Sequence, residues 1–241
     1  MKLHCDTLVF EVTRRCNMNC SHCMRGKAQC KDISKEIIDR TLESVESVES
    51  ILFTGGEIAL NLDAIKYILQ VCKEKNVMVY NFYAVTNGKV ITNDFVMTMC
   101  DWYCYVLDCG GDPEYCGGLA LSSDIFHEDI PDDNVNKLRC LSFFREEDKE
   151  VDWHSAKLIN LGNARSLVGF NKRDPSYSLP NLWYDEDDDR VVSENTITVT
   201  VDGDVLSDCD YEYESTDEIK IGSVLEENWV KNLLQHELCY N

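Results

Sequence analysis

The stretch that decides how this chain folds is Arg15-Cys16-Asn17-Met18-Asn19-Cys20-Ser21-His22-Cys23, which places three cysteines in one short loop. The preceding residues, Thr7-Leu8-Val9-Phe10-Glu11-Val12-Thr13, are mostly β-branched, aromatic or aliphatic. That composition predicts a buried strand running into the loop. A loop at the end of a first strand predicts a ligand site, because ligands of parallel α/β folds bind at the carboxyl ends of strands.

The spacing Cys16-x3-Cys20-x2-Cys23 suits a soft metal centre. Cysteine thiolates are the usual ligands of iron–sulfur clusters, and three of them on a [4Fe–4S] cube leave one iron open to a small molecule. The spacing alone also allows a zinc loop, whose fourth ligand would be His22, Cys30 or a more distant residue. The local pattern therefore predicts a metal site and leaves these two alternatives open.

The first half of the chain alternates between helix and strand patterns. Apolar residues at helical spacing predict a helix from Lys35 to Val45, another after Asn61, and a third that begins near Asn93. Between them, strands are expected at 51–54 and 77–86. This β-α-β-α-β order predicts a parallel sheet with helical crossovers.

Two further motifs follow strands in the same way as the cysteine loop. Gly55-Gly56-Glu57 comes after the second strand, and Thr86-Asn87-Gly88 after the third. Glycines let backbone approach a ligand closely, and the Glu57 carboxylate can accept charge-assisted hydrogen bonds from an ammonium group. Three motifs at three strand ends predict one shared site.

The second half shows weaker patterns. Strands are expected at 102–107, 118–122 and 157–160, and residues 166–192 are expected to form a long connection. Ile197, Val199 and Val201 alternate with threonines, and Asp202-Gly203 predicts a hairpin turn. A last helix is expected around Trp229 to Leu234. These patterns divide the chain into a core at 1–165, a connecting segment at 166–192 and a small cap at 193–241.

Charge and cysteine usage restrict the function. The formal net charge is −21, and so acidic a surface disfavours nucleic-acid binding, which depends on cationic contacts. No stretch approaches the roughly 20 apolar residues that span a bilayer, and no secretory signal is recognised at the N-terminus. The 13 cysteines are odd in number and irregularly spaced, which argues against a disulfide framework. A cytoplasmic protein without a membrane partner is expected.

Together, Cys16-x3-Cys20-x2-Cys23 and Thr54-Gly55-Gly56-Glu57 resemble the motifs of the radical S-adenosylmethionine (radical SAM) superfamily. The resemblance implies a partial (β/α)6 TIM-like barrel of parallel strands, with a small C-terminal hairpin and helix as a cap. It also implies that Cys16, Cys20 and Cys23 hold a [4Fe–4S] cluster whose open iron binds S-adenosylmethionine. His22 departs from the family pattern, in which an aromatic residue is more usual before the third cysteine.

The resemblance further implies a set of cofactor-binding residues. They are Gly55, Gly56, Glu57, Asn87, Ser122 and Arg165. An ordinary turn at Asn87-Gly88 and an ordinary strand end at Ser122 explain those two residues as well. His127 and His154 are more often surface or packing histidines than proton carriers.

The remaining cysteines have no spacing typical of a metal motif. Cys100, Cys104, Cys109 and Cys116 could hold a second cluster or zinc, but buried or incidental thiols explain them better. The tail 198–224 resembles the start of the auxiliary domain of peptide-modifying radical SAM enzymes, although only Cys209 and Cys239 are left there. A degenerate cap without its own cluster is therefore expected.

The resemblance implies reductive cleavage of S-adenosylmethionine to a 5′-deoxyadenosyl radical that abstracts hydrogen from a substrate. A peptide is the first expectation for that substrate, and flavodoxin or ferredoxin for the reductant. A small-molecule substrate and a glycyl-radical activase are the alternatives within the family. A zinc-binding interaction module is the alternative outside it.

Overall fold

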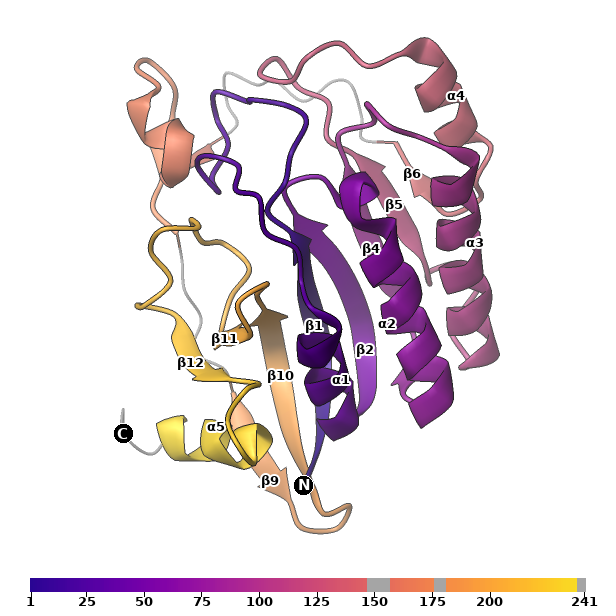
Figure 1. The fold of residues 1–241 in the computed structure, drawn as a ribbon, viewed down its shortest axis with the longest axis vertical. Coiled ribbons are helices and arrows are strands. Elements are labelled where there is room, and N and C mark those ends of the chain that lie inside the picture. The colour runs from indigo at the N-terminus through magenta and orange to yellow at the C-terminus, as the bar shows by residue number, and fades with distance from the viewer. Residues whose placement is uncertain (147–156, 176–180, 238–241) are drawn as a thin grey trace.

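The computed structural model describes residues 1–146, 157–175 and 181–237. A single mixed sheet forms its centre (Figure 1). The parallel strands lie in the order β10 (Arg190–Val199), β1 (Lys2–Thr13), β2 (Val45–Gly55), β4 (Phe82–Thr86), β5 (Gly118–Leu121) and β6 (Phe144–Arg145). The sheet stays open between β12 and β6, so the prediction of an α/β fold with an incomplete parallel barrel is confirmed.

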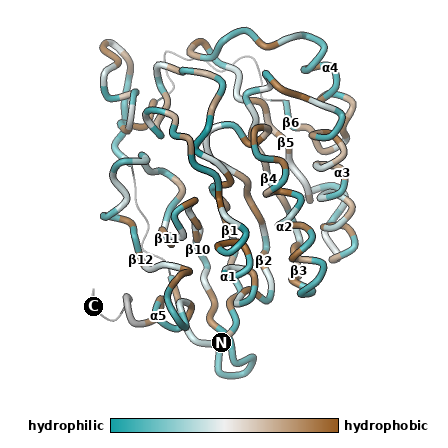
Figure 2. Tube along the Cα trace, in the orientation of Figure 1, coloured by the Kyte–Doolittle hydropathy of each residue, from teal (hydrophilic) through white to brown (hydrophobic). Residues whose placement is uncertain are grey.

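Helices connect the parallel strands. They are α1 (Lys35–Ser44), α2 (Leu62–Lys75), α3 (Asn93–Asp108) and α4 (Asp132–Arg139), with a 3-10 turn η1 (Ile58–Asn61) before α2. In Figure 1, α1, α2 and α3 lie side by side against the sheet. Their apolar sides face the strands, and Figure 2 shows hydrophobic residues along the central strands of the sheet. Among the described residues, no helix is both long and apolar enough to cross a membrane.

The aromatic core packs between α3 and the sheet. Trp102 is fully buried, lies 5.0 Å from Phe53 and 6.5 Å from Phe82 between ring centroids, and donates its indole N–H to the carbonyl of Ile65. Residues 102–107 were predicted as a strand, and that prediction is wrong because they are the second half of α3. The buried residues of α3 recur at helical spacing through Val106, so burial on one helix face accounts for the aromatic content.

The first turn of α3 depends on a side-chain cap. Thr92 accepts a hydrogen bond from the backbone N–H of Phe95 on its Oγ1, at 3.0 Å. We expect Thr92→Ala to lower the free energy of unfolding by about 1 kcal/mol, because that N–H loses its partner. Thr92→Ser should lower it far less. Urea titration of the three proteins checks this, and equal stability of the Ala variant would contradict it.

The two other segments with expected strands differ in detail. The predicted strand at 77–86 is two strands, β3 (Met78–Val79) and β4, because the chain breaks its pairing at Tyr80-Asn81. The predicted strand at 157–160 is β7 (Leu158–Ile159), which pairs with β8 (Lys172–Arg173) rather than with the central sheet. A short 3-10 turn, η2 (Gly162–Ser166), follows β7.

The tail adds to the sheet instead of standing apart from it. β10 begins at Arg190, inside the segment predicted as a connection, and pairs in parallel with β1 along most of its length. The expected hairpin at Asp202-Gly203 is present between β10 and β11 (Asp204–Leu206). The antiparallel strands β9 (Leu182–Asp185) and β12 (Lys220–Ser223) and the helix α5 (Trp229–Glu237) complete the tail.

Candidate active site

The carboxyl ends of β1, β2, β4 and β5 meet around one cavity of about 520 Å³. Its lining includes eight of the residues predicted for the site: Cys16, Cys20, Cys23, Gly55, Gly56, Glu57, Asn87 and Ser122. A second cavity of about 60 Å³ touches the same three cysteines. The parallel sheet therefore gathers motifs that lie far apart in the sequence.

The three cysteines are free thiols at the rim of both cavities. Burial raises the pKa of Cys20 to about 11, and the charges of Cys16 and Cys23 add to the effect. Burial also raises the pKa of Cys16. Such thiols stay protonated in the absence of a cation, so metal binding must deprotonate them and release protons.

The spacing of the sulfur atoms bears on which metal fits. Among the described residues, these three sulfurs do not form a group within 4.8 Å of one another. Zn–S bonds of about 2.3 Å in a tetrahedron would require sulfurs about 3.8 Å apart. In a cluster each thiolate binds a different iron, which spreads the sulfurs more widely. The loop therefore fits a [4Fe–4S] cluster better than a single zinc ion.

The two glycines are needed for packing within the protein. A Cβ on Gly55 would fall far inside contact distance of the Thr13 carbonyl oxygen, and one on Gly56 would do so against that of Arg15. Two backbone hydrogen bonds hold this contact: Gly56 N–H to Thr13 O and Glu57 N–H to Arg15 O, both 2.8 Å. The sequence predicted that these glycines let a ligand approach the backbone closely. In the structure, the backbone at the start of the cysteine loop makes that close approach.

Glu57 is buried, and protein donors occupy most of its carboxylate. Oε1 accepts from the hydroxyl of Thr86 at 2.7 Å and the N–H of Ala59 at 3.0 Å, and Oε2 accepts from the N–H of Asn87 at 2.7 Å. Burial raises the pKa of Glu57, and these three hydrogen bonds oppose the increase. A carboxylate has about four acceptor sites, so one remains for a ligand in the cavity.

The hydrogen bond from Thr86 gives a test of this arrangement. Thr86→Val removes a donor to a buried carboxylate, and we expect the free energy of unfolding to fall by about 2 kcal/mol at neutral pH. The pKa of Glu57 in the folded state would rise further above its unfolded value, so the loss should shrink as pH falls toward the range where Glu57 is protonated. Urea titrations at several pH values check this. A loss independent of pH would contradict it.

Asn87 and Ser122 also lie at the cavity. The side-chain amide of Asn87 donates to Oδ1 of Asn17 at 2.8 Å and lies 3.9 Å from the Cys16 sulfur. The backbone N–H of Ser122 donates to the Thr86 carbonyl, continuing the pairing of β4 and β5. The hydrogen bond from Asn87 to Asn17 therefore holds the cysteine loop against the end of β4.

Arg165 does not line either cavity. Its guanidinium is exposed and pairs with Oε1 of Glu212 at 2.8 Å, because η2 turns it toward the tail. The expectation that Arg165 binds the cofactor stays a prediction, because its guanidinium contacts Glu212 instead of lining a cavity. Asn163, two residues earlier, reaches the cysteine loop instead and donates to the Cys20 carbonyl at 3.1 Å.

Several residues near the cysteines could not be predicted from the sequence. Arg25 is buried, donates to the Tyr211 carbonyl at 2.9 Å and stacks 3.9 Å over the Tyr211 ring. Tyr213 lines the small cavity and donates its N–H to the Arg25 carbonyl at 3.1 Å. No local pattern marks these residues, because only the placement of the tail beside β1 brings them to the loop.

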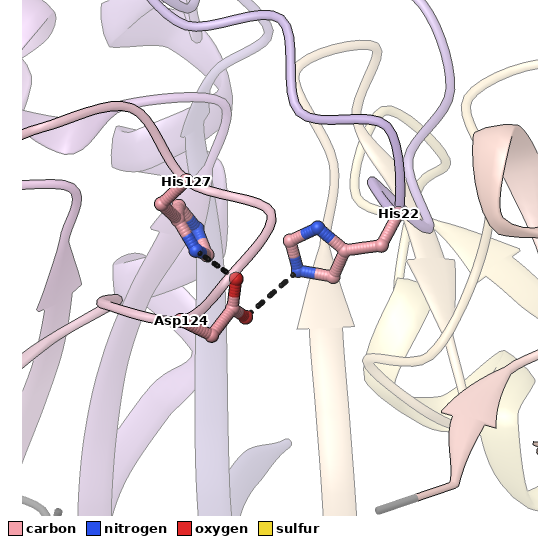
Figure 3. A group of neighbouring side chains, drawn as sticks. All are labelled: His22, Asp124 and His127. Atoms are coloured by element: carbon pink, nitrogen blue, oxygen red, sulfur yellow. Dashed lines mark hydrogen bonds and ion pairs between the residues drawn. The ribbon is translucent and has the colours of Figure 1, made fainter. Parts of the chain in front are cut away.

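His22 points toward the loop after β5, where its Nε2 lies 3.3 Å from Oδ2 of Asp124 (Figure 3). Burial lowers the pKa of His22. Burial alone would raise the pKa of Asp124, but hydrogen bonds from His127 and from the Phe126 N–H outweigh it and lower that pKa. The side chains of His22 and His127 are 20% and 11% exposed, so both are partly buried.

Among the described residues, no group of three close metal-binding side chains holds more than one of the remaining cysteines, and only Cys209 belongs to such a group, with Asp208 and Asp210. Among the described residues, Cys100, Cys104, Cys109 and Cys116 contribute to no group of three close metal-binding side chains. Cys104 lies in α3 and is exposed. Cys30, considered above as a zinc ligand, is also exposed and lines neither cavity. Cys239 and His154 lie outside the described residues.

Comparison with solved structures supports the fold. Native anSMEcpe with bound AdoMet and the Cp18Cys peptide matches with a TM-score of 0.59 at 15% identity, over 96% of this chain and 80% of that chain. A histidine-tagged form of anSMEcpe with bound AdoMet matches over the same shares with a TM-score of 0.56, also at 15% identity. At such low identity these likenesses establish the architecture alone.

Sequence comparison identifies the family. A segment of 91 residues is 32% identical to an uncharacterized protein of Methanocaldococcus jannaschii, and it makes up 36% of this chain and 32% of that relative. The chain thus spans about a third of the length of this curated relative. The family model of the radical SAM superfamily matches residues 10–133, which are just over half of the chain. The chain therefore belongs to the radical SAM superfamily of enzymes, whose cofactors are a [4Fe–4S] cluster and S-adenosylmethionine.

Proposed function

We propose that this chain holds its cluster on Cys16, Cys20 and Cys23, cleaves S-adenosylmethionine reductively and modifies a peptide. The observation that carries the proposal is that these thiols line the same cavity as Gly55, Gly56 and Glu57. When bound, the cluster supplies the electron that splits S-adenosylmethionine into methionine and a 5′-deoxyadenosyl radical. The protein's contribution is to position the cofactor against the substrate.

The roles of the protein residues follow from their contacts. Glu57 offers its one free acceptor site to the ammonium group of the methionine part, a charge-assisted hydrogen bond in a buried place. Asn87 keeps the cysteine loop in register with β4 through its hydrogen bond to Asn17. Ser122 follows β5 and lines the cavity, and its proposed role is to contact the ribose. These groups orient the cofactor without undergoing chemistry themselves.

The peptide substrate is inferred from two observations. The fold is similar to that of anSMEcpe, for which a structure with bound AdoMet and a peptide exists. The net charge of −21 favours a substrate with basic residues, because opposite charge speeds association. We also propose that flavodoxin or ferredoxin donates the electron. The tail's resemblance to an auxiliary domain stays a prediction.

Anaerobic reconstitution with iron and sulfide, followed by reduction in the presence of S-adenosylmethionine, tests the central step. We expect about four irons per chain and formation of 5′-deoxyadenosine, measured by chromatography. If a basic peptide is the substrate, adding it should increase the formation of 5′-deoxyadenosine. The mass of the peptide itself should also change. A colourless protein that takes up zinc but no iron would contradict the proposal and favour the interaction module. Nucleoside formation that responds only to small molecules would overturn the peptide part alone.

A further inference from the structure

Three side chains that line the large cavity form a compact group (Figure 3). His22 comes from the cysteine loop, whereas Asp124 and His127 come from the loop after β5. Nε2 of His22 lies 3.3 Å from Oδ2 of Asp124, and Nδ1 of His127 lies 2.7 Å from Oδ1. One carboxylate therefore has an imidazole nitrogen against each of its oxygens.

The group has the composition of a transition-metal site. One ligand atom from each residue lies within 4.8 Å of the other two. Imidazole nitrogen and carboxylate oxygen bind Zn²⁺ at about 2.0–2.2 Å, so two ligands of one tetrahedral ion stand about 3.3 Å apart. The separation of 3.3 Å between Nε2 of His22 and Oδ2 of Asp124 agrees with that value. Nδ1 of His127 and Oδ1 of Asp124 are 2.7 Å apart, a hydrogen bond that a bound ion would replace as the two atoms move slightly apart. Two histidines and one carboxylate also form a common ligand set for divalent metals of this type.

The surroundings leave this ligand set incomplete on the cavity side. All three residues line the cavity, yet their side chains are only 11–20% exposed. Phe126 stacks on His22 with ring centroids 4.8 Å apart, and Phe170 packs on Phe126, so an aromatic wall shields the site from one side. Nδ1 of His22 is buried and has no hydrogen-bond partner among the described residues. The protein thus supplies three ligands and leaves room for a fourth from the cavity.

We infer that His22, Asp124 and His127 bind one divalent transition-metal ion such as Zn²⁺. This site is distinct from the cluster site on the three cysteines. Three protein ligands and an open position facing a cavity are the arrangement of catalytic rather than structural zinc sites. The open position would take an oxygen of the substrate, such as a carboxylate or a peptide carbonyl. The ion would thereby fix the substrate beside the cofactor. The acidic chain as a whole attracts cations to this site.

The test uses the full chain with its cluster assembled, so that the cysteines are occupied before zinc is added. The reconstituted protein is equilibrated with Zn²⁺, freed of loosely bound metal with a weak chelator, and analysed for zinc and iron. Asp124→Asn and His127→Gln change one ligand each and leave every residue of the cysteine loop in place. His4→Gln is the matched control, because His4 bonds Ser47 in the sheet and lines neither cavity. Circular dichroism and iron content verify that each variant is folded and holds its cluster.

We expect one zinc per chain in the unmodified protein and in His4→Gln, and at least about tenfold weaker zinc binding in the two site variants. X-ray absorption at the zinc edge should show nitrogen and oxygen ligands without sulfur. Absence of retained zinc in the iron-loaded protein would overturn the inference, as would sulfur ligation or equal binding in all variants. His22, Asp124 and His127 would then only tie two loops together. Failure of cluster assembly would be seen separately, as missing iron.

Discussion

Replacing Cys16, Cys20 or Cys23 singly by Ala is expected to abolish formation of 5′-deoxyadenosine. In the proposed ligand set each thiolate binds a different iron, so losing one leaves that iron exposed and the cluster unstable. We expect iron content to fall to a small fraction and nucleoside formation to drop at least about a thousandfold, equivalent to about 4 kcal/mol of activation free energy. Iron analysis and chromatography on the anaerobically reconstituted variants measure both quantities.

Cys30→Ala is the matched control for these variants. Cys30 lies shortly after the loop, is exposed and lines neither cavity. Its removal should change neither iron content nor nucleoside formation. In the zinc-loop alternative, by contrast, Cys30 is one of the possible fourth ligands. Full activity in any of the three loop variants would refute the proposed ligand set. A loss in Cys30→Ala equal to theirs would show that cysteine removal acts through general instability.

Gly55→Ala is expected to give the largest loss of stability among single changes at the site. Gly55 has a φ of +143°, a backbone conformation that residues other than glycine rarely adopt. A Cβ added at this position would also collide with the Thr13 backbone. The end of β1 would have to move, and with it the start of the cysteine loop. We expect the free energy of unfolding to fall by about 3 kcal/mol, which lowers the melting temperature by roughly 6–12 °C in a chain of this size.

Gly110→Ala separates the two causes of that loss. Gly110 also has a positive φ, +96°, but an added Cβ there would meet nothing within 4 Å. Only the backbone strain should then count, at a cost of about 1 kcal/mol. Calorimetry on both variants compares them. If both lose the same amount, the contact between the Gly-Gly turn and the cysteine loop contributes little.

The parts of the site that the sequence predicted are those coded by short motifs at strand ends. The cysteine loop, Gly55-Gly56-Glu57 and Asn87 each follow a strand, and parallel pairing of β1, β2 and β4 brings them together without further information. Arg165 stays a prediction, because its observed position depends on η2 and on a partner, Glu212, that is 47 residues away. Ion pairs between distant segments leave no local pattern.

Errors in the predicted elements have similar causes. The run Trp102–Leu107 looked like a strand because aromatic and β-branched residues are common in strands. In the fold it continues a helix whose inward face is lined by the same residues, so tertiary packing overrides local propensity. β10 was placed in a cap because its hairpin was recognised but its parallel pairing with β1 could not be.

The pairing of β1 with β10 has a consequence for the order of events during synthesis. β1 ends within the first thirteen residues, yet its second neighbour in the sheet is not made until residue 190. The tyrosines that close over Arg25 arrive later still. Contacts so distant along the chain form late in folding. The cysteine loop is therefore synthesised well before the segments that enclose it, and it gains its last neighbours only when the tail has been made.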